Sequence, residues 1–234
     1  AGRWNAEKKK RIWESRVDST RLLSETLANL GNPPRVFVSA SAVGIYGDRG
    51  DEWLTEESAP GEGFVPRLCR EWENATAPAA RAGIRTVIHR IGIVLTPAGG
   101  ALAKMLPTFR LGLGGRMGDG RHFMSWISLD DAVRAIWHTI EDGQISGPVN
   151  TVAPVPVRNS ELAAALARKL GRPAFLPAPA FVVRAVFGRQ LSDEVLLASE
   201  RVKPAVLEDS GYRFMHREIH CALDYLLGAR RKPD

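Results

Sequence analysis

The sequence contains no uninterrupted apolar run of the roughly 20 residues that a membrane-spanning helix requires, so a membrane is not an expected partner. Cysteine is almost absent, and Cys69 and Cys221 have neither the spacing of a metal site nor a partner pattern. Both lie on predicted apolar helix faces, and we expect buried, reduced thiols, which fit a cytoplasmic or organellar interior. The first residues lack the apolar stretch of a signal peptide.

A dinucleotide-binding fingerprint is also missing, because no Gly-x-Gly-x-x-Gly precedes a helix in the 234 residues. The glycine cluster at 112–120 follows a predicted helix rather than a strand, and we interpret it as a surface excursion toward a second lobe. Buried strands are few as well: three are predicted, against about six in a doubly wound sheet. We therefore expect the chain to be the later part of a larger protein.

Charge of one sign is not concentrated in the sequence, although 32 Lys and Arg against 26 Asp and Glu give a net charge of +6. The dense basic runs are Lys8-Lys9-Lys10-Arg11 and Arg230-Arg231-Lys232, and no aromatic platform accompanies either. A solvated helix face and a frayed terminus explain them more simply. Nucleic acid is therefore not the expected partner.

The segment Val36–Gly47 is the most informative part of the chain. An apolar run passes into Ser39-Ala40-Ser41-Ala42 and ends at Tyr46-Gly47, which is typical of a buried parallel strand and the turn after it. In an open α/β sheet, ligands bind beyond the carboxyl ends of the strands, and small hydroxyl residues there let a flat ring approach. The alternative is that these serines only satisfy the backbone of a turn.

The pattern of elements predicts an α/β fold. Two further buried strands are expected at Thr86–Leu95 and Val149–Val152, with His89 as a packed core residue. Ser128 and Asp131 form a capping pair for a following helix, in which Asp131 is a cap or anchor. Other helices are expected over 7–30, from Phe64 to a break at Pro78, over 160–170, in two pieces within 180–200 split near Gly188, and over 216–227.

These elements indicate an incomplete Rossmann-type, doubly wound parallel sheet with a smaller, mainly helical C-terminal lobe. Residues 1–95, rejoined by 126–152, are expected to form the later half of a dinucleotide-binding domain. Residues 96–125 and 153–234 are expected to form a lobe on the substrate side.

The chain resembles the epimerase-like atypical short-chain dehydrogenase/reductase family, whose members are often labelled sugar-nucleotide epimerases. Each matching piece is weak alone, but together and in this order they are specific. The pieces are Arg3-Trp4, Ser15-Arg16-Val17, Ser39–Gly47, Trp72-Glu73, Arg90–Leu95, Gly99–Leu102, Phe109–Gly115, Ser125–Asp131, Asn150–Pro154, Val202-Lys-Pro204, Leu207 and Gly211–Phe214. The resemblance implies that about 60–70 residues, with the glycine-rich loop and four strands, precede residue 1.

The resemblance also implies where the chemistry lies. Classical members of the superfamily use Ser, Tyr and Lys, with Tyr-x-x-x-Lys on a helix, but counting back from Glu73 places that pair at Val65 and Cys69. The atypical family is similar in lacking the pair. Ser41 matches the catalytic Ser best, and Tyr46 is the phenol that could carry the proton instead, a packed core Tyr being the alternative.

Cofactor contacts are predicted for Ser39, Arg90 and Ile93. Arg90 ends a buried strand, where a charge is costly unless it is paired, and either a cofactor group or a carboxylate from the preceding part would pair it. Sugar-nucleotide epimerases place an Arg just before the Trp126 position, where this chain has Met124, which puts a nucleotide-sugar substrate in doubt.

The predicted function is that of an NAD(P)-dependent oxidoreductase or epimerase acting on a small polar substrate. The cofactor is expected to be NADP or NAD, with NADP slightly favoured. The alternative is a catalytically weak NAD(P)-binding sensor or scaffold. The expected partners are the nicotinamide dinucleotide and a small-molecule substrate, and a homodimer stays open.

Overall fold

Three parallel strands form the centre of the computed structural model, which describes residues 3–228. The order is β1 (Val36–Ala42), β3 (Arg85–Ile91), β7 (Gly147–Thr151). Both pairings are parallel, which confirms the predicted α/β class. The predicted basic run Arg230-Arg231-Lys232 lies outside the described residues.

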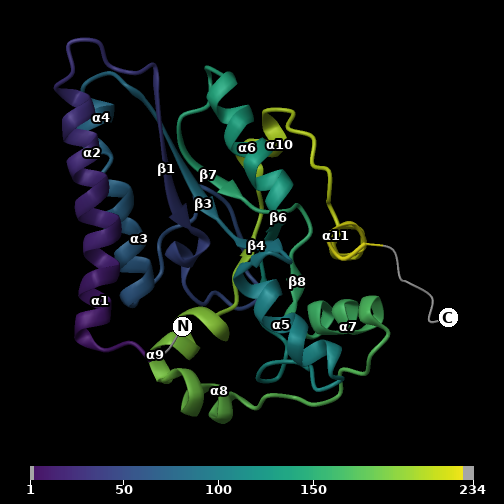
Figure 1. The fold of residues 1–234 in the computed structure, drawn as a ribbon. Coiled ribbons are helices and arrows are strands. Elements are labelled where there is room, and N and C mark those ends of the chain that lie inside the picture. Colours follow the sequence, from purple (N-terminus) through teal and green to yellow (C-terminus); the bar gives the residue numbers. More distant parts are fainter. Residues whose placement is uncertain (1–2, 229–234) are drawn as a thin grey trace.

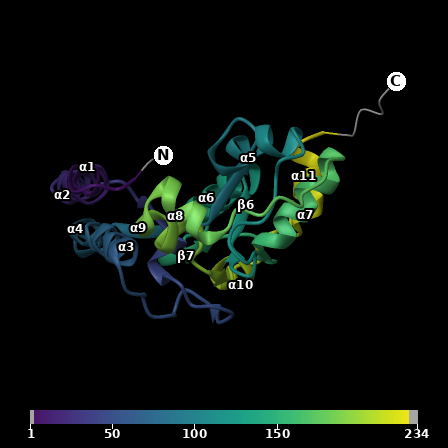
Figure 2. The same ribbon diagram turned by 90° about the horizontal axis from the view of Figure 1, so that it is seen from below.

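Helices cover both faces of this sheet (Figures 1 and 2). On one face lie α1 (Ala6–Trp13), the π-helical stretch Glu14–Asp18, α2 (Ser19–Ala28), α3 (Phe64–Asn74) and α4 (Ala77–Arg81). On the other lie α6 (Leu129–Glu141) and α10 (Ala205–Asp209). The alternation of β1 produces both interfaces: Val36 and Val38 belong to the cluster under α6 and α10, and Phe37 belongs to the cluster with α2 and α4.

A second core lies where the chain leaves the sheet. Leu95, Trp126 and their neighbours are buried against α5 (Gly100–Arg110), α7 (Asn159–Leu170) and α11 (Ile219–Leu226). Its short strand pairs are β4 (Ile93–Thr96) with β6 (Trp126–Ser128) and β5 (Phe123–Met124) with β8 (Val157–Arg158). β2 (Trp53–Leu54) pairs with β9 (Arg201–Val202) beside the sheet. The remaining segments are Val43–Tyr46 (3₁₀), α8 (Ala180–Phe187), α9 (Arg189–Leu191) and Ser192–Leu196 (π).

The strand expected at Thr86–Leu95 is divided at Gly92. The Gly92 N–H donates to Thr151 of β7, whereas the next N–H, from Ile93, donates to Ser125, so the chain changes neighbours at this residue. A Cβ on Gly92 would lie 2.6 Å from the Ser125 carbonyl oxygen and 2.8 Å from the Val152 side chain. Glycine is therefore required for the close approach of two backbones.

Other predictions have mixed outcomes. His89 is a buried core residue, hydrogen-bonded to Thr151 and Thr139, and burial lowers its pKa to about 4, which confirms the prediction. The break at Pro78 is wrong in part, because a second short helix, α4, includes it in its first turn, where a missing N–H costs nothing. Cys69 is buried as expected, but Cys221 is exposed, since α11 turns that side of the helix away from the core.

Asp131 is an anchor, as predicted. Its carboxylate is fully buried and accepts hydrogen bonds from the backbone N–H groups of Met215 and His216 and from the hydroxyl of Tyr212. It thereby joins the first turn of α6 to the C-terminal segment. Within residues 3–228, none of the helices is long and apolar enough to cross a membrane.

Replacing Gly92 with Ala is expected to lower the free energy of unfolding by about 1–3 kcal/mol, because the new methyl group overlaps fixed backbone. Urea unfolding followed by circular dichroism measures the change. Gly143→Ala is the matched control, since the space where its methyl group would stand is open to 4 Å among the described residues beyond its chain neighbours, and it should change stability by less than about 0.5 kcal/mol. Equal stabilities of the two variants would contradict the role assigned to Gly92.

Candidate functional site

Three polar residues form one row across the central sheet. The register pairs Ser41 of β1 with Arg90 of β3, and Arg90 with Asn150 of β7. The row lies near the carboxyl ends of the strands, where a parallel α/β sheet binds ligands. All three residues are buried, with Arg90 only 7% exposed, so their polar groups need partners inside the protein.

Glu73 of α3 is the partner of Arg90. Its two carboxylate oxygens accept from Nε and Nη2 of Arg90, each at 2.9 Å, in a bidentate ion pair. The Ser41 hydroxyl donates to the same carboxylate at 2.7 Å. Charge-assisted, bidentate pairs of this kind are among the stronger hydrogen bonds in proteins. The pair therefore fixes α3 against the ends of β1 and β3.

Tyr46 closes the other side of the guanidinium group. Its hydroxyl donates to the side-chain oxygen of Asn150 at 2.7 Å and accepts from Nη1 of Arg90 at 2.9 Å. Tyr46 is fully buried, and burial raises the pKa of its phenol, an effect that the neighbouring Arg90 charge partly opposes. The phenol thus stays protonated, with both of its hydrogen bonds made inside the protein.

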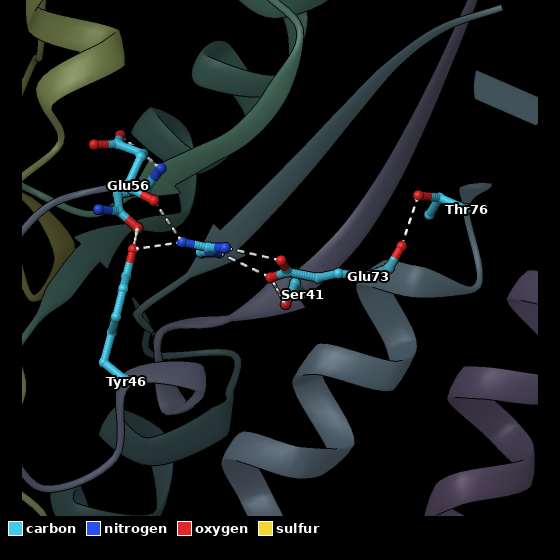
Figure 3. Close-up of polar contacts among 7 residues, drawn as sticks. Ser41, Tyr46, Glu56, Glu73 and Thr76 are labelled. Atoms are coloured by element: carbon cyan, nitrogen blue, oxygen red, sulfur yellow. Dashed lines mark hydrogen bonds and ion pairs between the residues drawn. The ribbon is translucent and has the colours of Figure 1, made fainter. Parts of the chain in front are cut away.

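Glu56 adds the loop before α3 to this network (Figure 3), and through Val206 it also adds the C-terminal segment. Its backbone carbonyl accepts from Nη1 of Arg90, and its Oε1 accepts from the N–H groups of Asn150 and Val206. Its other oxygen, Oε2, is buried and has no hydrogen-bond partner among the described residues. We call Ser41, Tyr46, Glu56, Glu73, Arg90 and Asn150 the arginine network.

The structure thus brings three predicted site residues together. Ser41, Tyr46 and Arg90 all belong to the arginine network, whereas the hydroxyl of the buried Ser39 donates a long hydrogen bond, 3.4 Å, to the carbonyl of Ala40. Ile93 lies outside the network and packs partly buried against the second core. Their catalytic and cofactor roles stay predictions. Arg90 needs no carboxylate from outside, because Glu73 of this chain provides it.

Sequence reasoning did not assign Glu73, Glu56 or Asn150 to the site. A signal for Glu73 existed: a buried strand Arg requires a carboxylate, and Glu73 is the acid on the helix face that carries Cys69 four residues earlier. Val65 and Cys69 stand at the Tyr and Lys positions of the usual Tyr-x-x-x-Lys pair, and neither side chain can transfer a proton in the usual way. Burial raises the pKa of the Cys69 thiol to about 12, and Val65 is apolar.

Other candidate sites do not coincide with the network. A surface cavity of about 570 Å³ is lined by residues such as Arg116, Ser160 and Phe175, and another of about 470 Å³ by residues such as Trp137 and Tyr212. Within residues 3–228, no cluster of His, Cys, Asp and Glu has the arrangement of a metal site.

Comparison with known families matches two parts of the chain. Residues 1–151 match the family described as NAD dependent epimerase/dehydratase, and residues 178–226 match one described as a domain of unknown function, DUF1731. An epimerase family protein of Mycobacterium bovis is 44% identical over 223 residues, which cover 95% of this chain and 73% of the relative. The human epimerase family protein SDR39U1 is 37% identical and covers 94% of this chain, with 75% of its own length matched.

Solved structures of epimerase family proteins also resemble this chain. The crystal structure of human SDR39U1, isoform 2, with NADPH superimposes with a TM-score of 0.91 at 36% identity, covering 96% of this chain and 76% of that one. A nucleoside-diphosphate sugar epimerase from Corynebacterium glutamicum has a TM-score of 0.78 at 41% identity, covering 97% of this chain and 45% of that one. The UDP-glucose 4-epimerase of Thermotoga maritima, at 17% identity and a TM-score of 0.73, shares the fold.

Replacing Glu73 with Gln is expected to lower the free energy of unfolding by about 3–5 kcal/mol, because the buried Arg90 charge loses its counter-ion. Chemical denaturation measures the loss. Glu71→Gln, on the same helix, is the control, since Glu71 is only half-buried and its 3.6 Å ion pair is with the exposed Arg70, and it should cost less than about 1 kcal/mol. A Glu73→Gln protein as stable as the control would show that the pair does not hold the site together.

Proposed function

Since the chain belongs to the NAD dependent epimerase/dehydratase family, we propose that its complete gene product is an NAD(P)-dependent oxidoreductase or epimerase that acts on a small polar substrate. The observation that carries the proposal is the match, over 96% of this chain, to a human relative whose structure contains NADPH. That ligand favours NADP over NAD as the cofactor. When bound, the nicotinamide would accept or donate the hydride.

The residues present fit the nicotinamide end of such a cofactor. Beyond the carboxyl ends of β1 and β3 lie Val43–Tyr46 and Gly92-Ile93, which we call the strand-end region. Ile93 is partly exposed, and Gly92 adds no side chain, so an apolar ring has a surface to contact. Ile93 is accordingly kept as a proposed cofactor contact, while the contact of the buried Ser39 stays a prediction. The pyrophosphate end finds no glycine fingerprint within residues 1–234.

The arginine network fixes the position of the strand-end region, because Tyr46 of that region is hydrogen-bonded to Arg90 and Asn150. We propose a positioning role for Arg90, in place of the predicted direct cofactor contact, because four hydrogen bonds already bind its guanidinium group to Glu73, Tyr46 and Glu56. Ser41 and Tyr46 serve as supports in the same way, since each hydroxyl donates to a neighbour inside the protein. Their predicted catalytic role would require these bonds to open.

A second candidate function has one observation in its favour. Val65 and Cys69 occupy the positions of the usual proton-transferring pair, which suits a catalytically weak NAD(P)-binding sensor or scaffold. A nucleotide sugar is one substrate class for the first candidate, by analogy with the Corynebacterium glutamicum structure. Met124 opposes it, because a thioether side chain has neither a positive charge nor a hydrogen-bond donor for a diphosphate.

Hydride exchange separates the two candidates. The complete gene product is expected to transfer deuteride from 4-deuterated NADPH to the carbonyl carbon of at least one member of a panel of small aldehydes, ketones and keto-sugar nucleotides, as measured by mass spectrometry. Enzyme turnover requires this transfer, whereas a sensor needs only binding. NADPH binding without exchange into any member of the panel would favour the sensor.

Residues 1–234 alone are expected to bind NADPH with a dissociation constant weaker than about 100 μM, because the chain lacks the glycine turn and its phosphate hydrogen bonds, worth roughly 1.5–3 kcal/mol each. Isothermal titration calorimetry gives the value, with the human relative as positive control. Micromolar affinity of residues 1–234 would mean that the strand-end region binds most of the cofactor unaided.

A further inference from the structure

Hydride transfer to a carbonyl requires a proton for the oxygen, and the arginine network does not offer one. The Ser41 hydroxyl donates to Glu73, and the fully buried Tyr46 phenol donates its O–H to the side-chain oxygen of Asn150. The Cys69 thiol is buried in the apolar cluster that includes Val43 and Ile45. A different group must therefore carry the proton if the proposed function holds.

Glu200 has a carboxyl group near the strand-end region, and it does not belong to the arginine network. It precedes β9, and its backbone is fixed on both sides: its N–H donates to the Phe123 carbonyl at 3.1 Å, and its carbonyl accepts from the Ser125 hydroxyl at 2.7 Å. Its side chain is partly buried, and within the described part of the chain no hydrogen bond reaches its carboxyl oxygens. A rigid backbone thus holds a carboxyl group whose bonding capacity is unused.

The Glu200 carboxyl faces the strand-end region. Its Oε1 lies 3.8 Å from the point where a Cβ on Gly44 would stand, and the Val65 side chain lies 2.7 Å from the same point. Gly44 is in the turn that follows β1, and Val65 is in the first turn of α3. Glu200 therefore reaches, from the C-terminal part of the chain, the position where the missing tyrosine was expected.

We infer that Glu200 is the proton-transfer group of this site and that its substrate is a small carbonyl compound or the corresponding alcohol. The inference rests on the proposed function, because it needs the nicotinamide as hydride donor. In the reductive direction the carbonyl carbon receives hydride, with its electron pair, from the reduced nicotinamide. The oxygen takes the proton of Glu200, which leaves an alcohol, oxidised nicotinamide and a carboxylate that regains its proton from water.

The surroundings of Glu200 favour the protonated form that this step needs. Burial, followed by the negative charge of Asp48, raises the pKa of Glu200 from 4.5 to about 8. Asp48 is itself held by the N–H groups of Gly50 and Ser199. Cys69 adds no charge, because burial keeps its thiol protonated, and the Glu194 carboxylate is bound to the Val65 N–H at 2.7 Å. At neutral pH the group is therefore an acid that can donate.

The protonation state can be measured without cofactor. The side-chain carboxyl ¹³C signal that disappears in Glu200→Gln should titrate near pH 8. Between roughly pH 4.5 and 8 the folded protein keeps a proton on Glu200 that the unfolded chain releases. As the pH rises through this window, the folded-to-unfolded ratio should therefore fall by up to about tenfold per pH unit, relative to Glu200→Gln. Titration of that signal near pH 4.5 would overturn the inference.

Turnover supplies the second readout, in the complete gene product with NADPH and whichever substrate shows hydride exchange. Glu200→Gln should lower kcat about 100- to 10,000-fold, leave the dissociation constant of NADPH unchanged, and remove the loss of activity above pH 8. Glu200→Asp should restore part of kcat. The control is Glu57→Gln, which replaces an exposed carboxylate outside the arginine network.

The outcomes separate the two levels of proposal. An active wild type with an equally active Glu200→Gln variant overturns the role of Glu200 and leaves the proposed function standing. A wild type that binds NADPH but transfers no hydride overturns the proposed function, and the proton-transfer role is then wrong as well. Loss of kcat in Glu200→Gln with normal NADPH affinity, normal folding and a lost ionisation near pH 8 supports both.

Discussion

The buried charge of Arg90 is the constraint on which the site depends. A guanidinium group that is 7% exposed in the middle strand of a sheet is tolerated only with a close counter-charge and filled hydrogen bonds. Glu73 supplies the charge from α3, Tyr46 and Glu56 supply oxygens from the turns after β1 and before α3, and Asn150 extends the chain of bonds to β7. One residue thereby sets the relative positions of three strands, a helix and two loops.

This arrangement divides the polar groups at the strand ends into two kinds. Those of the arginine network are buried and hydrogen-bonded to one another. This makes the region rigid, and the hydroxyl protons of Ser41 and Tyr46 are donated to Glu73 and Asn150. Glu200 is of the other kind, since its backbone is fixed between Phe123 and Ser125 but its carboxyl has no partner within residues 3–228. A rigid, hydrogen-bonded arginine network beside one acid without a hydrogen-bond partner among these residues is an arrangement suited to chemistry on a bound substrate.

The sequence allowed the fold to be predicted more completely than the site. Apolar runs and helical periodicity located all three sheet strands, and the Ser128–Asp131 spacing identified a helix start, because these signals are local. The division at Gly92 and the exposure of Cys221 depend on which backbone or helix lies opposite, which no local pattern encodes. Arg90 was recognised as a buried charge in need of a partner, but Glu73 lies 17 residues away on another element. Glu200 was missed for the same reason: its surroundings come from segments more than 70 positions distant.

The most direct measurement is a crystal structure of the complete gene product with NADPH and a substrate analogue. We predict that Arg90 keeps its bidentate contact with Glu73, that Tyr46 stays on Asn150, and that a Glu200 oxygen lies within about 3.5 Å of the analogue's oxygen, a distance suited to proton transfer. A structure in which Arg90 has left Glu73 for a cofactor phosphate or ribose would contradict the central claim, because the arginine network would then be part of the cofactor site and not its support.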